Sequence, residues 1–184
     1  MSSKELIAEI LKVKKYIRGI TLSGGEPTLQ IDFIAQLFQE AKKLDLTTFV
    51  DTNGSIPLQD KKELLKYLDK AMVDLKSTTD KEHKKLTGVP LENVVENIRF
   101  LFSVGKLYEV RTVIVPDFLD NEANVDFVSS LIASLDKTIR YKLIKYRSWG
   151  VREGLLSAPS PTSQAMNKLV ELAKSKGLTN IIVL

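Results

Sequence analysis

The sequence predicts an α/β fold built on a parallel sheet, within a single domain that spans residues 1–184. Short apolar segments of extended character alternate along the chain with segments whose apolar residues recur at helical spacing. Strands that are separated by single helices pair in parallel through right-handed crossovers. The chain has 184 residues, 43% of them hydrophobic, which is enough to bury a core.

In the first half of the chain, turn-forming residues mark where the elements end. Residues 4–16 suit a helix that Ser3 can cap, and residues 19–23 suit a strand that stops at two glycines. The same patterns predict, in order, a helix at 29–44, a strand at 47–51, a helix at 61–69 and a strand at 71–75.

In the second half, Gly105 and Gly177 each follow a helical run as C-terminal caps, and Pro116 closes a strand. The predicted elements are, in order, a helix at 91–102, a strand at 107–115, a helix at 125–135, a strand at 139–145, a helix at 162–176 and a strand at 180–184. The longest irregular stretch runs from Ser148 to Pro161, and long loops in compact domains are often functional.

The number of strands narrows the architecture. Five or six strands are too few for a closed eight-stranded barrel, which takes about 250 residues. The chain starts with a helix rather than a strand, so we expect a strand to be missing upstream. The expected fold is a partial (β/α)6-type TIM-like barrel, open, with parallel strands of which the first is missing.

Composition excludes several classes of function. Lys and Arg number 27 against 23 Asp and Glu, and the lysines are scattered over helix faces without interleaved aromatic residues. This pattern favours solvated surfaces over a nucleic-acid footprint. No apolar run approaches the ~18 residues that span a bilayer, and no signal peptide opens the chain, so we predict a cytoplasmic protein without a membrane partner. The absence of cysteine excludes disulfides, thiol nucleophiles and cysteine-ligated clusters within this chain.

The segment 23–28 (SGGEPT), at the end of the first predicted strand, carries the most specific chemistry. Glycines there permit positive φ and leave room for a ligand against the main chain. The carboxylate of Glu26, beside backbone carbonyls, can receive an ammonium group, which has three donors and no acceptor. A tight turn with a solvated Glu26 is the alternative.

Ligands of parallel α/β folds bind at the carboxyl ends of the strands, where further polar groups fall in this sequence. Asp51 ends the second strand, although it could simply form an Asx turn. Asp74 and Lys76 end the third strand two residues apart, so both face one way and can pair or share a ligand. Lys76 alone would fit an extended surface lysine. The remaining cations are Arg111 within the fourth strand, and Lys145 and Arg147 at the fifth.

These segments carry a family resemblance. In chain order they read SGGEPTLQ, VDTNG, MVDLK and RTVIVP, and in that order they resemble the radical S-adenosylmethionine (SAM) superfamily. Within it, residues 4–184 are most similar to activating enzymes of glycyl-radical enzymes, of which pyruvate formate-lyase activating enzyme is the type. The segments 83–88 (HKKLTG) and 147–150 (RSWG) also fall where such activases have them.

The resemblance implies which residues hold SAM. The segment that holds the methionine amino group is matched by Gly24, Gly25 and Glu26, and polar positions around the carboxylate are matched by Asp51, Asp74 and Lys76. Asp51 and Asp74, with the carbonyl of Met72, could also hold a hard cation, because oxygen ligands suit one.

The resemblance also assigns a role on the fourth strand. Arg111 matches an arginine that faces the cofactor or the substrate loop, and pairing with Asp74 or Glu26 is the alternative. Val113 and Val115 would line the adenine, or would belong to an ordinary strand core.

The implied activity is the generation of a glycyl radical on a partner enzyme such as pyruvate formate-lyase. It requires SAM, a [4Fe-4S] cluster and an electron donor such as flavodoxin or ferredoxin. The family binds its cluster through Cys-x-x-x-Cys-x-x-Cys, and this sequence has no cysteine. The chain therefore resembles an activase without its N-terminal cluster segment. We expect weak SAM binding, no catalytic residue and no radical chemistry from this chain alone.

Two departures and two other function classes remain. Arg147 stands where some activases have a histidine, and His83, the only histidine, is interpreted as an exposed helix position. The chain could be a naturally cluster-less binding module, which a stop codon rather than a cysteine motif upstream of Met1 would favour. It could also be an aldolase-like enzyme in which Lys76, activated by burial and Asp74, forms a Schiff base that borohydride traps.

Overall fold

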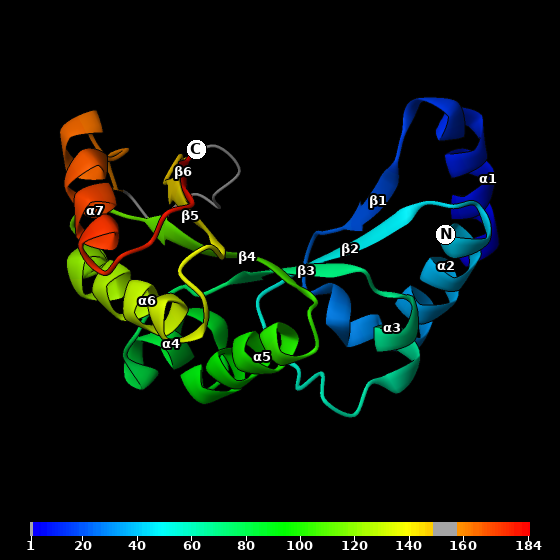
Figure 1. The fold of residues 1–184 in the computed structure, drawn as a ribbon, viewed down its shortest axis with the longest axis horizontal. Helices are drawn as coiled ribbons and strands as arrows, with labels where there is room; N and C mark the ends of the chain where they lie inside the picture. The colour runs from blue at the N-terminus through cyan, green and yellow to red at the C-terminus, as the bar shows by residue number, and fades with distance from the viewer. Residues whose placement is uncertain (1, 149–157) are drawn as a thin grey trace. The chain divides into compact units, whose positions relative to one another are not determined.

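The computed structural model of the chain describes residues 2–148 and 158–184 (Figure 1). Within this part, parallel strands form one open sheet in the order β1-β2-β3-β4-β5-β6. The strands are β1 Gly19–Leu22, β2 Thr47–Thr52, β3 Lys70–Asp74, β4 Leu107–Ile114, β5 Arg140–Lys145 and β6 Ile181–Val183. The predicted fold class is confirmed.

Helices follow the strands in alternation. The α-helices are α1 Ser3–Val13, α2 Ile31–Lys43, α3 Lys62–Tyr67, α4 Asp80–Thr87, α5 Leu91–Ser103, α6 Asn121–Leu135 and α7 Ser163–Ser175, with short 3-10 helices η1 Lys14–Tyr16 and η2 Pro27–Gln30. Among the described residues, no helix is long and apolar enough to cross a membrane.

The start of α1 differs from the prediction by one residue. Ser2, not Ser3, caps the helix: the Ser2 hydroxyl accepts from the backbone N of Glu5, and the Glu5 carboxylate accepts from the backbone N of Ser2. This reciprocal capping box requires a glutamate three residues after the cap, a spacing that only Ser2 has.

Helix α4 was not among the helices predicted from apolar spacing, and it corrects the exposure expected for the helix position His83. The segment is too polar to show an apolar stripe, but Thr79 caps its start and Gly88, at φ 78°, ends it. His83 is fully buried on this helix, so an exposed position was wrong. Its Nδ1 lies 2.9 Å from the carbonyl O of Val89, which follows the end of α4 in the chain.

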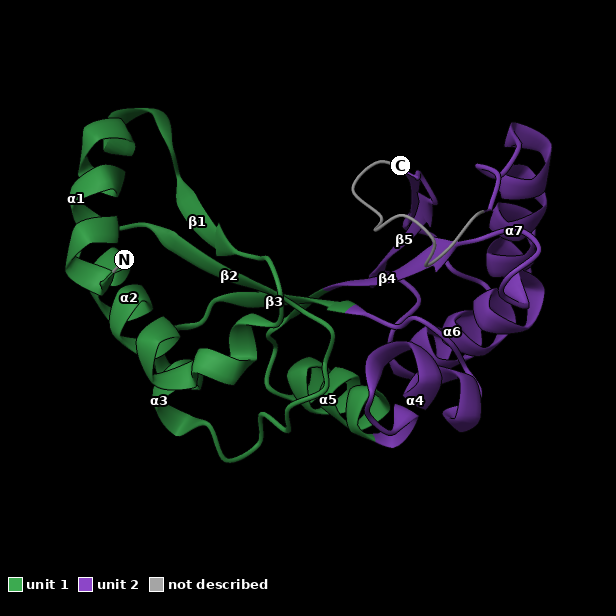
Figure 2. Cartoon of the chain, turned by 180° about the vertical axis from the view of Figure 1, so that it is seen from behind, with its two compact units in different colours: residues 1–73, 93–108 green, residues 74–92, 109–184 purple. Residues whose placement is uncertain are grey.

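The chain divides into two compact units, each described here by itself (Figure 2). Unit 1 comprises the residues up to Val73 together with Asn93–Tyr108, and unit 2 comprises Asp74–Glu92 and Glu109–Leu184. A single domain over residues 1–184 stays a prediction.

In unit 1, the carboxyl ends of β1 and β2 lie side by side. The two strands pair in register from Gly19 with Thr47 to Leu22 with Val50. Helix α2 packs against both strands, and its buried face meets the sheet core (Figure 1). Because parallel strands end at the same edge, the segments after Leu22 and after Thr52 become neighbours.

In unit 2, the part of β4 from Glu109 onward alternates between two faces. Val110, Thr112 and Ile114 are buried on one face, and period-two alternation places Arg111 on the other. The backbone N of Leu75 donates to the carbonyl O of Arg111 at 2.9 Å, so the residues after β3 run beside β4.

Candidate functional site

The turn after β1 is a double-glycine bend with open space around it. Gly24 and Gly25 have φ of 95° and 55°, a region that side chains rarely adopt. Apart from the adjacent residues of the chain, no atom of the described residues lies within 4 Å of where a Cβ would stand on either glycine. Backbone conformation, not crowding, therefore requires glycine here, and a ligand has room to approach the main chain.

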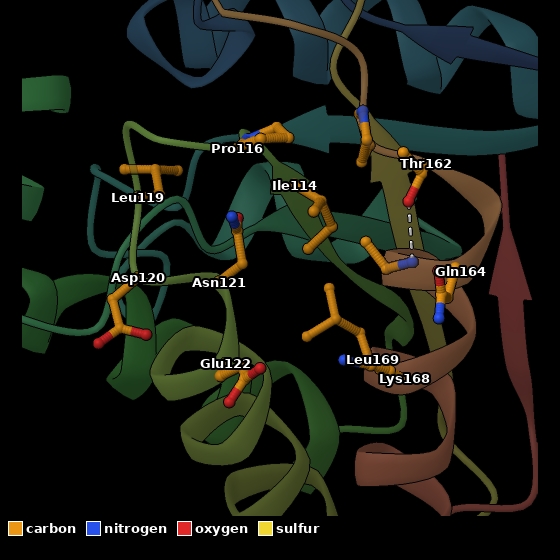
Figure 3. A pocket seen from close by; sticks show the side chains of 12 residues that line it. Ile114, Pro116, Leu119, Asp120, Asn121, Glu122, Thr162, Gln164, Lys168 and Leu169 are labelled. Carbon is orange, nitrogen blue, oxygen red and sulfur yellow. Dashed lines mark hydrogen bonds between the residues drawn. The ribbon is translucent and has the colours of Figure 1, made fainter.

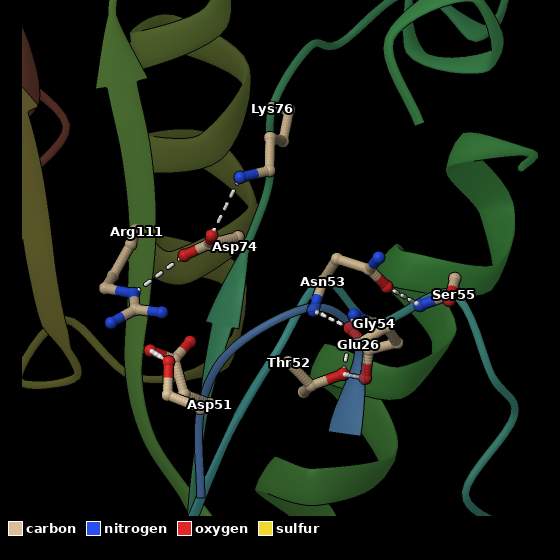
Figure 4. Close-up of polar contacts among 10 residues, drawn as sticks. Glu26, Asp51, Thr52, Asn53, Gly54, Ser55, Asp74, Lys76 and Arg111 are labelled. Carbon is tan, nitrogen blue, oxygen red and sulfur yellow. Dashed lines mark hydrogen bonds and ion pairs between the residues drawn. The ribbon is translucent and has the colours of Figure 1, made fainter. Parts of the chain in front are cut away.

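The Glu26 carboxylate fastens this turn to the end of β2 (Figure 4). Its Oε1 accepts hydrogen bonds from the backbone N of Thr28 at 3.0 Å, the Thr28 hydroxyl at 2.5 Å and the Thr52 hydroxyl at 2.7 Å. Its Oε2 accepts from the backbone N of Asn53 at 2.7 Å. The carboxylate thus makes four bonds and caps the start of η2.

Neutral donors surround the half-buried Glu26. None of the ion pairs among residues 2–148 and 158–184 involves this carboxylate. A carboxylate offers about four lone-pair sites over two oxygens, and Oε2 uses only one in the described residues. The site therefore has a negative charge, remaining acceptor capacity and bare glycine backbone beside it, the chemistry that an ammonium group requires.

Asp51, at the end of β2, also contacts the glycine turn. The hydroxyl of Ser23 donates to Oδ2 of Asp51 at 3.2 Å. The aspartate lies within β2. Unit 1 thus brings together the predicted residues Gly24, Gly25, Glu26 and Asp51.

Unit 2 contains the second group of predicted residues, also drawn in Figure 4. Oδ1 of Asp74 accepts from Nε of Arg111 at 2.7 Å, and Oδ2 accepts from Nζ of Lys76 at 2.9 Å. Asp74 and Lys76 form the ion pair that their spacing allowed, and of the two carboxylates left open as partners of Arg111 the structure shows Asp74. Burial lowers the pKa of the Arg111 guanidinium. Two cations on one carboxylate leave this group net positive, which suits an anionic ligand.

The structure gives little support for a metal ion at the predicted residues Asp51 and Asp74. In the part of the chain that the structure describes, no cluster of three or more His, Cys, Asp or Glu could hold a metal ion. The hard cation predicted at Asp51 and Asp74 stays a prediction, and both oxygens of Asp74 already face cations.

The end of β5 adds little to the site. Lys145 is the last residue of β5, and Arg147 is exposed two residues beyond it. Trp149, Gly150 and most of the predicted functional loop up to Pro161 lie outside the described residues. The roles of Val113 and Val115 toward adenine stay predictions, and Val115 is buried.

The sequence reasoning missed the partners of Glu26. Thr28, Thr52 and Asn53 supply its four donors. Thr28 follows Glu26 by two residues, so this contact is local along the chain. Thr52 and Asn53 gave no local signal, since they lie 26 and 27 residues away.

A second missed group lies on β4 and β5. Glu109 is fully buried, and its Oε1 lies 2.7 Å from Nζ of Lys142. Glu109 precedes Arg111 by two residues and shares its face of the sheet. Charged residues at alternate positions of β4, Glu109 and Arg111, were the signal in the sequence that this face of the strand is charged. The ion pair with Lys142 neutralises the Glu109 carboxylate inside the sheet.

Unit 2 also contains a half-open pocket of about 540 Å³ (Figure 3). It lies where the end of β4 meets the starts of α6 and α7, and Asp120 and Thr162 cap those helices. Its apolar wall includes Ile114 and Leu169. None of the predicted cofactor residues lines this pocket.

Comparison with known proteins places these features in a family context. Residues 1–128 match the family model described as the radical SAM superfamily. The pyruvate formate-lyase-activating enzyme of Staphylococcus epidermidis (strain ATCC 12228 / FDA PCI 1200) is 32% identical over 159 residues, which are 81% of this chain and 63% of the relative. The enzyme of that name from Staphylococcus aureus (strain USA300) is 31% identical over 159 residues, with the same coverage. The chain thus spans 63% of the length of these relatives.

Solved structures agree on the fold. A domain of a pyruvate-formate lyase-activating enzyme from Bacteroides vulgatus ATCC 8482 aligns with a TM-score of 0.75 at 20% identity, over 90% of this chain and 98% of that one. Streptococcus suis SuiB bound to S-adenosylmethionine aligns with a TM-score of 0.75 at 17% identity, over 100% of this chain and 43% of that one.

Proposed function

Because this chain belongs to the radical SAM superfamily, we propose that it provides the SAM-binding portion of an activating enzyme for a glycyl-radical enzyme. The observation that carries the proposal is the environment of the Glu26 carboxylate. Among the described residues, all of its hydrogen-bond donors are neutral, and a double-glycine bend with open space lies beside it. An ammonium group is the ligand whose donors and charge suit such a site.

The polar groups of each unit are considered by themselves. In unit 1, Glu26 and the backbone carbonyls of Gly24 and Gly25 would receive the methionine amino group. In unit 2, taken by itself, the cationic pair Lys76 and Arg111, held by Asp74, would suit a carboxylate, the group that the family resemblance assigns to Asp74 and Lys76. Asp51 would orient the bend through Ser23.

The residues of this chain do not fit an iron–sulfur cluster. Such clusters are held by cysteine thiolates, and the sequence contains none. The family uses SAM together with a [4Fe-4S] cluster, and bound SAM supplies a carbon radical that removes a hydrogen atom from a substrate. This chain would bind and orient SAM, and we expect no SAM cleavage from it alone.

The partners belong to the same proposal. A glycyl-radical enzyme such as pyruvate formate-lyase would be the protein substrate, flavodoxin or ferredoxin the electron donor, and the cytoplasm the location. Support comes from the similarity to activating enzymes at 32% identity.

The Schiff-base alternative finds no support at Lys76. Nucleophilic lysines are desolvated, whereas the Lys76 side chain is 39% exposed and forms an ion pair with Asp74. A binding module that holds SAM without chemistry shares the site described above, and the binding experiment applies to both.

Calorimetric titration of SAM into the chain tests the proposal. We expect a weak dissociation constant, on the order of 0.1 mM, and at least tenfold weaker binding to Glu26→Gln. Glu40→Gln, a change at an exposed glutamate of α2, is the matched control and should bind like the wild type. 5′-Methylthioadenosine lacks the amino and carboxylate groups and should not compete. Absence of binding at millimolar SAM, or equal binding by Glu26→Gln, would refute the proposal.

A further inference from the structure

Helix α5 presents a buried asparagine to the loop that follows β2. Asn97 is fully buried. Its Nδ2 donates to the carbonyl O of Gly54 at 2.8 Å and of Ile56 at 2.8 Å, and its Oδ1 accepts from the backbone N of Leu58 at 3.0 Å. One side chain therefore satisfies three backbone groups of a loop, where each unsatisfied buried group would be costly.

The opposite end of this loop holds the Glu26 carboxylate. Residues 53–58 are called the β2 loop below. The backbone N of Asn53 donates to Glu26, and the Asn53 Oδ1 accepts from the backbone N of Ser55 at 2.8 Å. The Thr52 hydroxyl, which donates to Glu26, accepts from the backbone N of Gly54 at 3.0 Å. Hydrogen bonds thus run continuously from Asn97 through the β2 loop to Glu26.

Packing fixes the loop at the same point. Gly54 has φ of 69°, and a Cβ there would stand 3.0 Å from Cγ1 of Val94 and 3.2 Å from Cγ1 of Val73. A second asparagine of α5, Asn93, donates from Nδ2 to the carbonyl O of Ser55 at 3.2 Å. Since all these residues belong to unit 1, the arrangement does not depend on how the two units are placed.

We propose that Asn97 is a positioning residue for the ammonium site at Glu26. By holding the β2 loop, Asn97 fixes the backbone N of Asn53, which in turn fixes the direction of the Glu26 carboxylate. The positioning of Glu26 is independent of the ligand, whereas its consequence for SAM binding rests on the proposed function.

Two measurements on the full chain test this role in Asn97→Ala. Amide hydrogen exchange followed by NMR should speed up at Leu58, whose backbone N donates to Asn97. It should also speed up about tenfold at Asn53, whose backbone N donates to Glu26 instead. Titration with SAM should show about tenfold weaker binding. Leu101→Ala, a core truncation on the same helix, is the matched control, since it lowers global stability without touching the β2 loop's hydrogen bonds. In that variant, exchange at Asn53 should rise no more than at other core amides.

The outcomes separate the two proposals. Faster exchange at Leu58 with unchanged exchange at Asn53 would overturn the positioning role, whether or not SAM binds. If the wild type does not bind SAM but Asn53 responds to Asn97→Ala, the proposed function fails and the positioning role stands. If Asn97→Ala does not fold, Asn93→Ala replaces it, because this change removes a single part-buried hydrogen bond to the β2 loop. Faster amide exchange at Asn53 in Asn93→Ala would then support positioning of Glu26 from α5, and unchanged exchange there would overturn it.

Discussion

Replacing Glu26 with glutamine tests whether the carboxylate organises unit 1 as the geometry indicates. A glutamine side chain offers one carbonyl oxygen and one NH₂ group. With its carbonyl in the place of Oε1, the donors from Thr28 and Thr52 keep an acceptor. The NH₂ group then faces the backbone N of Asn53, donor against donor, where the wild type has a 2.7 Å hydrogen bond.

The expected loss of unfolding free energy follows from that one exchange. A hydrogen bond to a charged group contributes about 1.5–3 kcal/mol, and an unsatisfied N–H costs about 1–3 kcal/mol. Because Glu26 is half-buried, water relieves part of both terms, and we expect about 2 kcal/mol in total. Thr52→Val removes the hydroxyl that donates to Glu26 and should cost a similar ~2 kcal/mol. In the double variant the two losses should fall short of additivity by about 1 kcal/mol.

Urea unfolding monitored by circular dichroism measures these values. A loss of about 2 kcal/mol lowers the midpoint by about 1 M urea for a typical slope. The control Glu40→Gln, in an exposed ion pair with Lys43, should change the stability by less than about 0.5 kcal/mol. A cost below about 0.5 kcal/mol for Glu26→Gln, or full additivity with Thr52→Val, would refute the reasoning.

Two further predictions concern the rest of the chain. Burial raises the pKa of the Asp69 carboxyl, but its hydrogen bonds, including that from Lys42, outweigh burial, so the pKa of Asp69 in the folded chain lies below its ordinary value. The stabilisation from the Asp69 carboxylate is therefore present above that value and is lost as the pH falls through the folded pKa. The unfolding free energy measured at decreasing pH should fall less steeply in Asp69→Asn than in the wild type. An identical pH profile for the two proteins would contradict this. Gly54→Ala should cost about 3 kcal/mol, because positive φ is combined with a contact to Val94, whereas Gly88→Ala should cost about 1 kcal/mol for positive φ alone. Thermal unfolding of the two variants compares them, and equal costs would show that the contact at Gly54 relaxes freely.

The sequence predicted the order of the elements because that information is local. Apolar spacing and turn residues distinguish strands from helices within a few positions, and the six strands and the helices other than α4 follow them. Apolar spacing did not reveal helix α4, because its faces are polar and only the caps Thr79 and Gly88 mark its ends. The same missing pattern led to the wrong exposure of His83.

The sequence also placed the candidate residues at the strand ends, since parallel strands share one carboxyl edge. It predicted that Asp74 could pair with Lys76, because they lie two residues apart on one strand end. For Arg111, whose partner lies 37 residues away, the sequence left two carboxylates open, and the structure shows Asp74.

By itself, the sequence thus determined the fold class, the glycine bend and the candidate residues at the strand ends, all from short-range patterns. Only the tertiary structure decided where the Glu26 carboxylate turns, because its partners Thr52 and Asn53 come from the neighbouring strand, 26 and 27 residues away. It also decided that Asn97, 43 residues from Gly54, holds the β2 loop. A hydrogen bond between distant segments depends on how strands and helices pack, and local periodicity carries no record of that packing.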